Sequence, residues 1–68
     1  MLQEKTIQSY ANKLVKLENM LDETLTIAES KVIENQITEV MNNFMVLTRY
    51  DMTEAMRLDE AVQKLLTK

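Results

Sequence analysis

The chain offers few side chains that carry out enzymatic chemistry. Its 68 residues include no histidine and no cysteine, so the commonest general base, the thiolate nucleophile and the usual zinc ligands are missing. Two adjacent acidic pairs exist, Asp22-Glu23 and Asp59-Glu60. Neighbouring residues of a helix point about 100° apart, so neither pair forms an acid/base dyad. A metal cage around Glu34 and Glu39 would need a second chain. We therefore predict a non-enzyme with no catalytic residue, no metal and no cofactor.

The composition points to a single all-α domain spanning residues 1–68. The chain contains no glycine and no proline, the residues that most often form turns and hairpins. Leu, Met, Glu, Lys, Gln and Ala, which favour helix, are abundant. A core made by 68 residues is marginal, and without cysteine no disulfide can reinforce it. Oligomerisation is then the remaining way to stabilise the domain.

Two amphipathic stretches predict an antiparallel helical hairpin, about residues 2–28 and 31–67. The first has apolar residues at alternating spacings of three and four, the pattern of a helix packed lengthwise on others: Ile7, Tyr10, Leu14, Leu17, Leu21 and Ala28. The apolar face of the second covers about half of its circumference, which is wider than the usual stripe. The two faces would point in opposite directions on one uninterrupted helix, so we predict a bend near Glu29-Ser30-Lys31. Ser30, or Thr26 with Glu29, would cap the second helix.

The second helix outruns the first, and two arrangements would cover its overhang. In the favoured arrangement the second helix is continuous and two hairpins form a dimeric four-helix bundle. The alternative is a three-helix bundle with a break near residues 48–51. Asp51 followed by Glu54 resembles a capping box, with Tyr50 and Ala55 as a hydrophobic staple, and Asp51 would otherwise lie inside the apolar face. The uninterrupted phase of that face through Thr48 favours the continuous helix.

Charge and hydropathy suggest a cytoplasmic protein that avoids nucleic acid and membranes. The net charge is −3, and between Glu18 and Glu39 six acidic residues face only Lys31, an excess that repels phosphate backbones. The first residues lack the pattern of a secretory signal, and no apolar run approaches the ~20 residues that span a bilayer. A polar surface formed by Lys5, Asn12, Lys13 and Lys16 leaves RNA binding as an alternative. That layout resembles the helical-hairpin dimers of small plasmid copy-number regulators.

The wide apolar face is the predicted interaction site. Met41, Met45, Met52 and Met56 follow one another at spacings of 4, 7 and 4, and flexible methionines favour surfaces that adapt to partners. The predicted interface with a second copy or a larger protein comprises Met41, Phe44, Met45, Met52, Met56, Leu58, Val62 and Leu65. A second surface patch is predicted at Val46, Arg49, Tyr50 and Arg57.

These features predict a small protein–protein interaction module: a regulator, adaptor or inhibitor that forms a homodimer and acts through its apolar helix face. An alternative is a chaperone that covers a sticky helical partner. In length and layout the chain is similar to the small hairpin chaperones of bacterial type III secretion needles. RNA binding by a helical-hairpin dimer is the second alternative.

Overall fold

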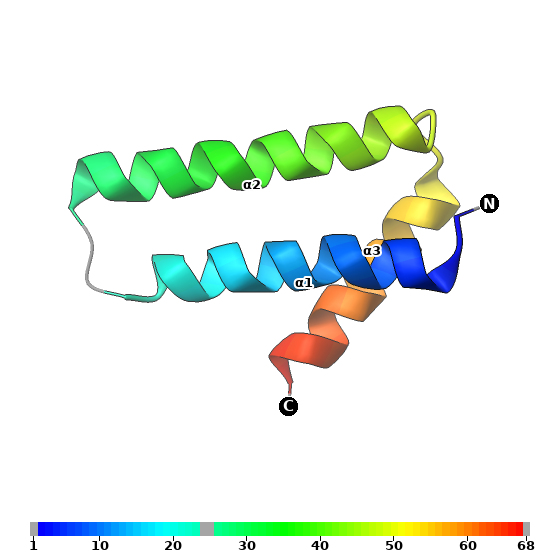
Figure 1. Cartoon of the computed structure of the whole chain (residues 1–68), viewed down its shortest axis with the longest axis horizontal. Coiled ribbons are helices and arrows are strands. Elements are labelled where there is room, and N and C mark those ends of the chain that lie inside the picture. The colour runs from blue at the N-terminus through cyan, green and yellow to red at the C-terminus, as the bar shows by residue number, and fades with distance from the viewer. Residues whose placement is uncertain (1, 24–25, 68) are drawn as a thin grey trace.

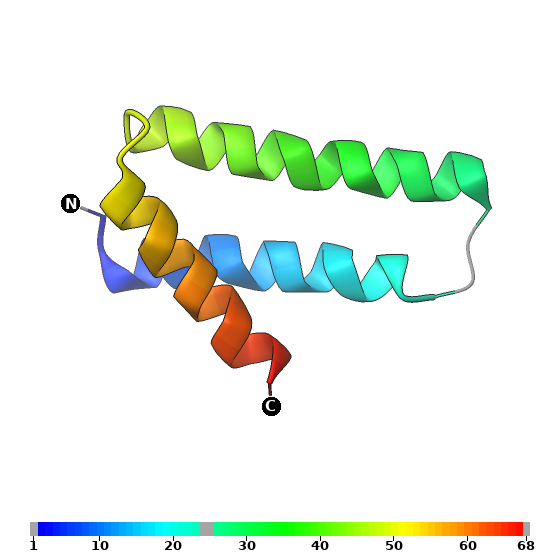
Figure 2. The ribbon, with the colours of Figure 1, turned by 180° about the vertical axis from the view of Figure 1, so that it is seen from behind.

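The structure, a computed structural model, describes residues 2–23 and 26–67. These residues form three α-helices and no strand: α1 (Glu4–Leu21), α2 (Ile27–Leu47) and α3 (Met52–Leu66). In Figure 1, α1 and α2 run antiparallel along the long axis, and α3 passes obliquely across one face of α1. Figure 2 shows the same crossing from the other side. The all-α prediction is confirmed, and the three-helix alternative, not the continuous second helix, describes the chain.

The predicted bend at residues 29–31 is wrong because the chain turns earlier. α1 ends at Leu21 and α2 begins at Ile27, so Glu29-Ser30-Lys31 lies inside α2. Thr26, not Ser30, is the N-cap: its hydroxyl oxygen accepts from the Glu29 backbone N–H (3.1 Å) and donates to the Glu29 carboxylate (2.9 Å). The capping pair predicted as the alternative therefore starts the helix. Positions 24 and 25 of the predicted first helix lie outside the described residues.

The predicted continuous helix over 31–67 is also wrong, because α2 stops at Leu47 in a Schellman-type turn. The Tyr50 N–H donates to the Met45 carbonyl oxygen (2.7 Å), and the Arg49 N–H donates to that of Val46 (3.1 Å). This pattern satisfies carbonyls at a helix C-terminus and normally uses glycine in the left-handed conformation. Here Arg49 and Tyr50 adopt φ angles of 58° and 60°. The turn therefore carries backbone strain of about 1–2 kcal/mol per residue.

Asp51 starts α3 as its N-cap. Its carboxylate accepts a hydrogen bond from the Thr53 N–H at 2.8 Å. In a continuous second helix, Asp51 would place a charge inside the apolar face. As the N-cap, its carboxylate instead accepts from one of the N–H groups that have no partner within the helix. Glu54, the expected second half of the capping box, turns away to other partners.

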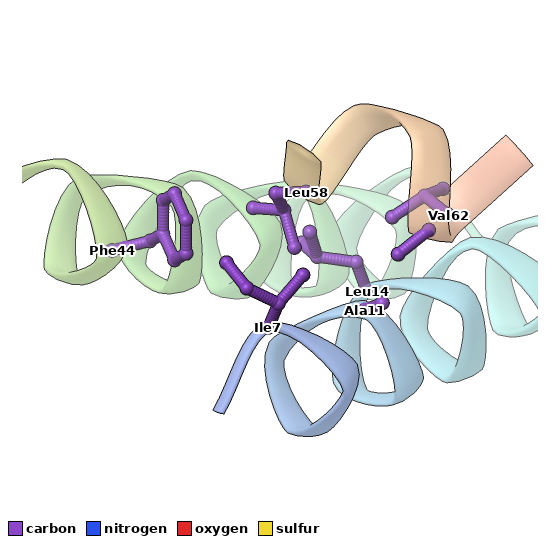
Figure 3. Packing of buried hydrophobic residues seen from close by; sticks show 7 residues of the cluster. Ile7, Ala11, Leu14, Phe44, Leu58 and Val62 are labelled. Carbon is purple, nitrogen blue, oxygen red and sulfur yellow. The ribbon is translucent and has the colours of Figure 1, made fainter. Parts of the chain in front are cut away.

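One hydrophobic cluster joins the three helices, and α1 lies at its centre. Its buried members are Ile7, Ala11, Leu14, Phe44, Leu58, Ala61 and Val62. Figure 3 shows the α1 side chains between Phe44 of α2 and the two labelled residues of α3. The Phe44 ring meets the Tyr10 ring edge to face, with centroids 5.2 Å apart, an arrangement that aromatic pairs prefer.

The molecule is flat and open for its size. Its Cα extents are 39 × 27 × 16 Å and its radius of gyration is 12.5 Å, compared with about 11 Å for a compact domain of this length. α3 crosses only one end of the α1–α2 pair (Figure 2). The other end of the pair therefore keeps apolar side chains, such as Met20 and Val32, at the surface.

Replacing Phe44 by aspartate should unfold the domain. Phe44 is 0% exposed, and a charge buried without a partner costs more than a small domain's total stability of about 5 kcal/mol. Far-UV circular dichroism should show loss of most helicity. Val46→Asp is the matched control, because the Val46 side chain of the same helix is 62% exposed, and this variant should stay folded. An unchanged helical spectrum for F44D would contradict the core described above.

Replacing Arg49 by glycine should stabilise the domain. Glycine tolerates a φ of 58° without the Cβ clash, so we expect a gain of about 1 kcal/mol and a rise in Tm of about 4–8 °C. A thermal unfolding curve followed by circular dichroism measures this rise in Tm. Arg49→Ala removes the same side chain but keeps the Cβ, and it should bring no such gain. Equal Tm values for the two variants would show that the turn is not strained.

Candidate functional site

The structure divides the predicted apolar interface between the core and the surface. Phe44, Leu58 and Val62 are buried in the chain's own core, and Met41, Met45 and Leu65 pack against it half-buried. Only Met52 and Met56 are well exposed, at 69% and 63%. The end of α2 at Leu47 also separates the four methionines into two pairs on different helices. They therefore do not form the single stripe that their spacing suggested.

A groove between α2 and α3, the α2–α3 groove, collects the accessible part of this face. It has a volume of about 210 Å³ and α1 forms its floor. Its lining residues are Leu14, Glu18, Ile37, Met41, Ala55, Leu58, Asp59, Val62 and Gln63. The groove exists because α3 diverges from α2 after the turn at residues 48–51 (Figure 2).

The exposed methionines extend the rim of the α2–α3 groove along α3. Met52 and Met56 precede Asp59 and Gln63 at helical spacings of four, three and four, which places all four on one stripe. Asp59 and Gln63 line the groove. The only charged side chains among the lining residues, Glu18 and Asp59, are acidic. The site is thus apolar and adaptable, with negative charge on two of its three helices.

A second groove, the α1–α2 groove, lies between the first two helices and has a volume of about 470 Å³. It is lined by Lys13, Lys16, Leu17, Met20, Gln36, Glu39, Val40 and Asn43. Its α1 side carries the two lysines and its α2 side carries the glutamate. The Lys13 ammonium lies 5.5 Å from the centroid of the Tyr10 ring. Two of the four residues predicted as an RNA-binding surface, Lys13 and Lys16, therefore border an apolar groove.

The predicted second patch includes one residue that is engaged elsewhere. Val46 and Tyr50 are 62% and 68% exposed, and Arg49 is also exposed. Arg57, however, pairs with Glu54 at 2.9 Å and with Glu4 at 3.1 Å. The break before α3 separates Arg57 from the helix that carries Val46 and directs it to the start of α1.

Glu54 and Arg57 tie the first residues of the chain to α3. Glu54 is 4% exposed, and its carboxylate accepts from the Leu2 backbone N–H at 3.2 Å. Arg57 donates to the Leu2 carbonyl oxygen at 3.0 Å. The hydrogen bond from its guanidinium to Glu54, and to a smaller extent the one to Glu4, raises the pKa of Arg57. This pair was not predicted from the sequence, although a spacing of three on a helix permits it; the partners near residue 2 depend on tertiary structure.

The described residues offer no further chemical site. No group of three or more acidic, histidine or cysteine side chains within residues 2–23 and 26–67 is placed to share a metal ion. A third hollow, of about 400 Å³, lies between α1 and α3 beside Arg57 and has a mixed polar lining. None of the three helices, over the residues described, has both the length and the apolar character that crossing a bilayer requires.

Comparison of the chain with known protein families, with curated proteins and with solved structures finds no match.

Replacing Arg57 by methionine should destabilise the domain more than replacing both members of its buried pair. In R57M the Glu54 carboxylate stays buried but loses its guanidinium partner, which is the costly outcome for a buried charge. The double variant E54Q/R57M removes that charge and should recover part of the loss. Urea denaturation midpoints measure both. Arg49→Met, at the exposed turn, is the control and should leave the midpoint near that of the unaltered chain. Equal losses in the single and double variants would mean that the pair is not coupled.

Proposed function

We propose that this chain is a non-enzymatic interaction module that binds one helix of a larger protein in the α2–α3 groove, and so acts as a regulator or adaptor. The observation that carries the proposal is the pair of exposed methionines, Met52 and Met56, on the α3 stripe that continues through Asp59 and Gln63 into the lining of the α2–α3 groove. Grooves between helices that hold an amphipathic helix use the same arrangement. Methionine suits this role because its side chain adapts to different apolar surfaces.

The surface area supports a role that depends on a partner. The chain exposes 5170 Å², whereas a compact monomer of 8.0 kDa exposes about 4450 Å². Part of the difference is apolar, because nine large hydrophobic side chains are exposed among the residues that the structure describes. Contiguous apolar surface beside a groove is typical of interaction sites.

The charge of the groove indicates the chemistry of the partner. Glu18 on α1 and Asp59 on α3 line it, and neither has a basic neighbour among the lining residues. An incoming helix with an apolar stripe flanked by lysine or arginine would complement both the groove and its rim. The matching apolar spacing on that helix is i, i+4, i+7.

A designed peptide tests this function directly. The probe is a helical peptide with leucines along one face and lysines beside them, compared with a scrambled peptide of the same composition. Fluorescence anisotropy should show micromolar binding of the first peptide and at least tenfold weaker binding of the second.

The double variant M52Q/M56Q should weaken binding of the designed peptide about tenfold, equivalent to ~1.4 kcal/mol, since it removes apolar contact without changing charge. Val46→Gln, equally exposed but outside the groove, is the control and should bind normally. Equal affinity for the two peptides, or an unaffected M52Q/M56Q variant, would refute the proposal.

A further inference from the structure

The α1–α2 groove has opposite charges on its two sides and apolar residues between them. Lys13 and Lys16 stand on α1 and Glu39 on α2, while Leu17, Met20 and Val40 supply the apolar lining. Among the described residues these three charges form no ion pair within the chain. A partner surface that places an acidic residue opposite the two lysines and basic residues opposite the glutamate would complement these charges.

A stripe of alternating apolar and polar side chains on α2 extends beyond the groove at both ends. On α2, the lining residues Gln36, Val40 and Asn43 belong to a helical stripe with spacings of four, four, three and four, whose ends are Val32 and Leu47. Val32 is 55% exposed and Leu47 is 52% exposed. The stripe therefore runs along most of α2 on the side of the α1–α2 groove, and about half of the surface of each end residue is exposed.

We infer that a second copy of this chain occupies the α1–α2 groove, so that two α1–α2 pairs form a four-helix core with one α3 attached to each outer side. The inference concerns a different groove from the one in the proposed function and does not depend on it. The reason is self-complementarity: the chain itself carries the reverse charge pattern when it is turned about a twofold axis parallel to the groove.

The charges select one orientation of the two copies. With the twofold axis parallel to the groove, α1 of one copy lies on α2 of the other, and Lys13 and Lys16 face the partner subunit's Glu39. With the axis across the groove, α1 lies on α1 and lysines face lysines, which is unfavourable. The α2–α3 groove could not serve in the same way, because both of its lining charges, Glu18 and Asp59, are acidic.

The size of the face sets the expected strength of the dimer. α1 has 18 residues and is therefore about 27 Å long, and two packed helices present a width of about 20 Å. The face measures on the order of 500 Å² per copy, or about 1,000 Å² in total, which is below the roughly 1,200 Å² at which stable specific interfaces begin and in the range of weak, transient ones. We therefore expect dissociation in the micromolar range.

The first test is the solution mass of the full chain by light scattering and sedimentation, from about 1 to about 500 μM. The mass should rise from that of one chain to that of two as the concentration increases. The charge-reversed variants K13E/K16E and E39K should each remain monomeric over this range, with a dissociation constant at least tenfold higher than that of the unaltered chain. Circular dichroism should show unchanged helicity, because all three residues are exposed.

Mixing the two variants gives the decisive result. K13E/K16E carries only acidic charges at the groove and E39K only basic ones, so an equimolar mixture should form a heterodimer although neither variant dimerises alone. The combined variant K13E/K16E/E39K, in which the pattern is simply reversed, should dimerise again. An unaltered chain that stays monomeric at 500 μM, or a mixture that stays monomeric, would overturn the inference.

The two grooves can be separated experimentally. M52Q/M56Q should dimerise as the unaltered chain does while losing affinity for the designed basic peptide. K13E/K16E should keep that affinity while losing the dimer. Loss of dimerisation in M52Q/M56Q would place the interface at the α2–α3 groove and would overturn the assignment of the second copy to the α1–α2 groove.

Discussion

The packing of Ile7, Ala11 and Leu14 against two helices at once is the interaction on which the rest of the structure depends. These three residues of α1 are almost completely buried, and they contribute to a core that also contains Phe44 of α2 and Leu58 of α3. α1 is the element that makes extensive contacts with both neighbours. Ala11, with a small side chain and no exposed surface, is also part of this cluster (Figure 3). Both grooves border α1 for the same reason, since they are the spaces left on either side of its contact with α2.

The turn between α2 and α3 shows how a strained local structure is maintained by packing. Two consecutive residues without glycine's freedom, Arg49 and Tyr50, take the left-handed conformation, at a cost of a few kcal/mol together. The fold compensates by reversing the chain there, because only then can Leu58 and Val62 reach the face of α1 beside Phe44. Burial of one large apolar side chain contributes about 1.5–3 kcal/mol, so two of them offset the strain.

Sequence patterns predicted the helical class and most of the core but not where the helices stop. The spacing of Ile7 and Leu14 in the first segment and of Phe44 in the second predicted buried positions correctly, because burial follows helical periodicity. The breaks were harder to place because no glycine marks either turn. At residues 48–51 the apolar phase continues unbroken through a stop, and the capping signal of Asp51 competed with that phase. The packing of α3 on α1, which is a tertiary interaction, decides between a continuous helix and a break before Asp51.

The candidate sites were predictable only in part for a related reason. Methionine content indicated an adaptable surface, and Met52 and Met56 are indeed exposed. Leu58 and Val62 lie on the same apolar face, but they are buried in the chain's own core. The sequence of one helix shows that its apolar face must be buried, but it does not show which helix packs against that face. The α1–α2 groove depends on Lys16 and Glu39, which lie on different helices. Their proximity follows from the antiparallel pairing and cannot be read from spacing within one segment.

The contact between the first and last helices also has a consequence for the order in which the chain can fold. The bond from Arg57 to the Leu2 carbonyl oxygen spans 55 positions, so docking of α3 closes a loop nearly as long as the chain, with an entropic cost that grows with the logarithm of that length. The α1–α2 contact is more local and closes at lower entropic cost. During synthesis from the N-terminus, α1 and α2 therefore emerge and meet while the other side of α1 is still bare. Ile7 and Ala11 gain their full cover only after α3 has been synthesised and has docked on α1, so the α1–α3 part of the core is completed after the α1–α2 part.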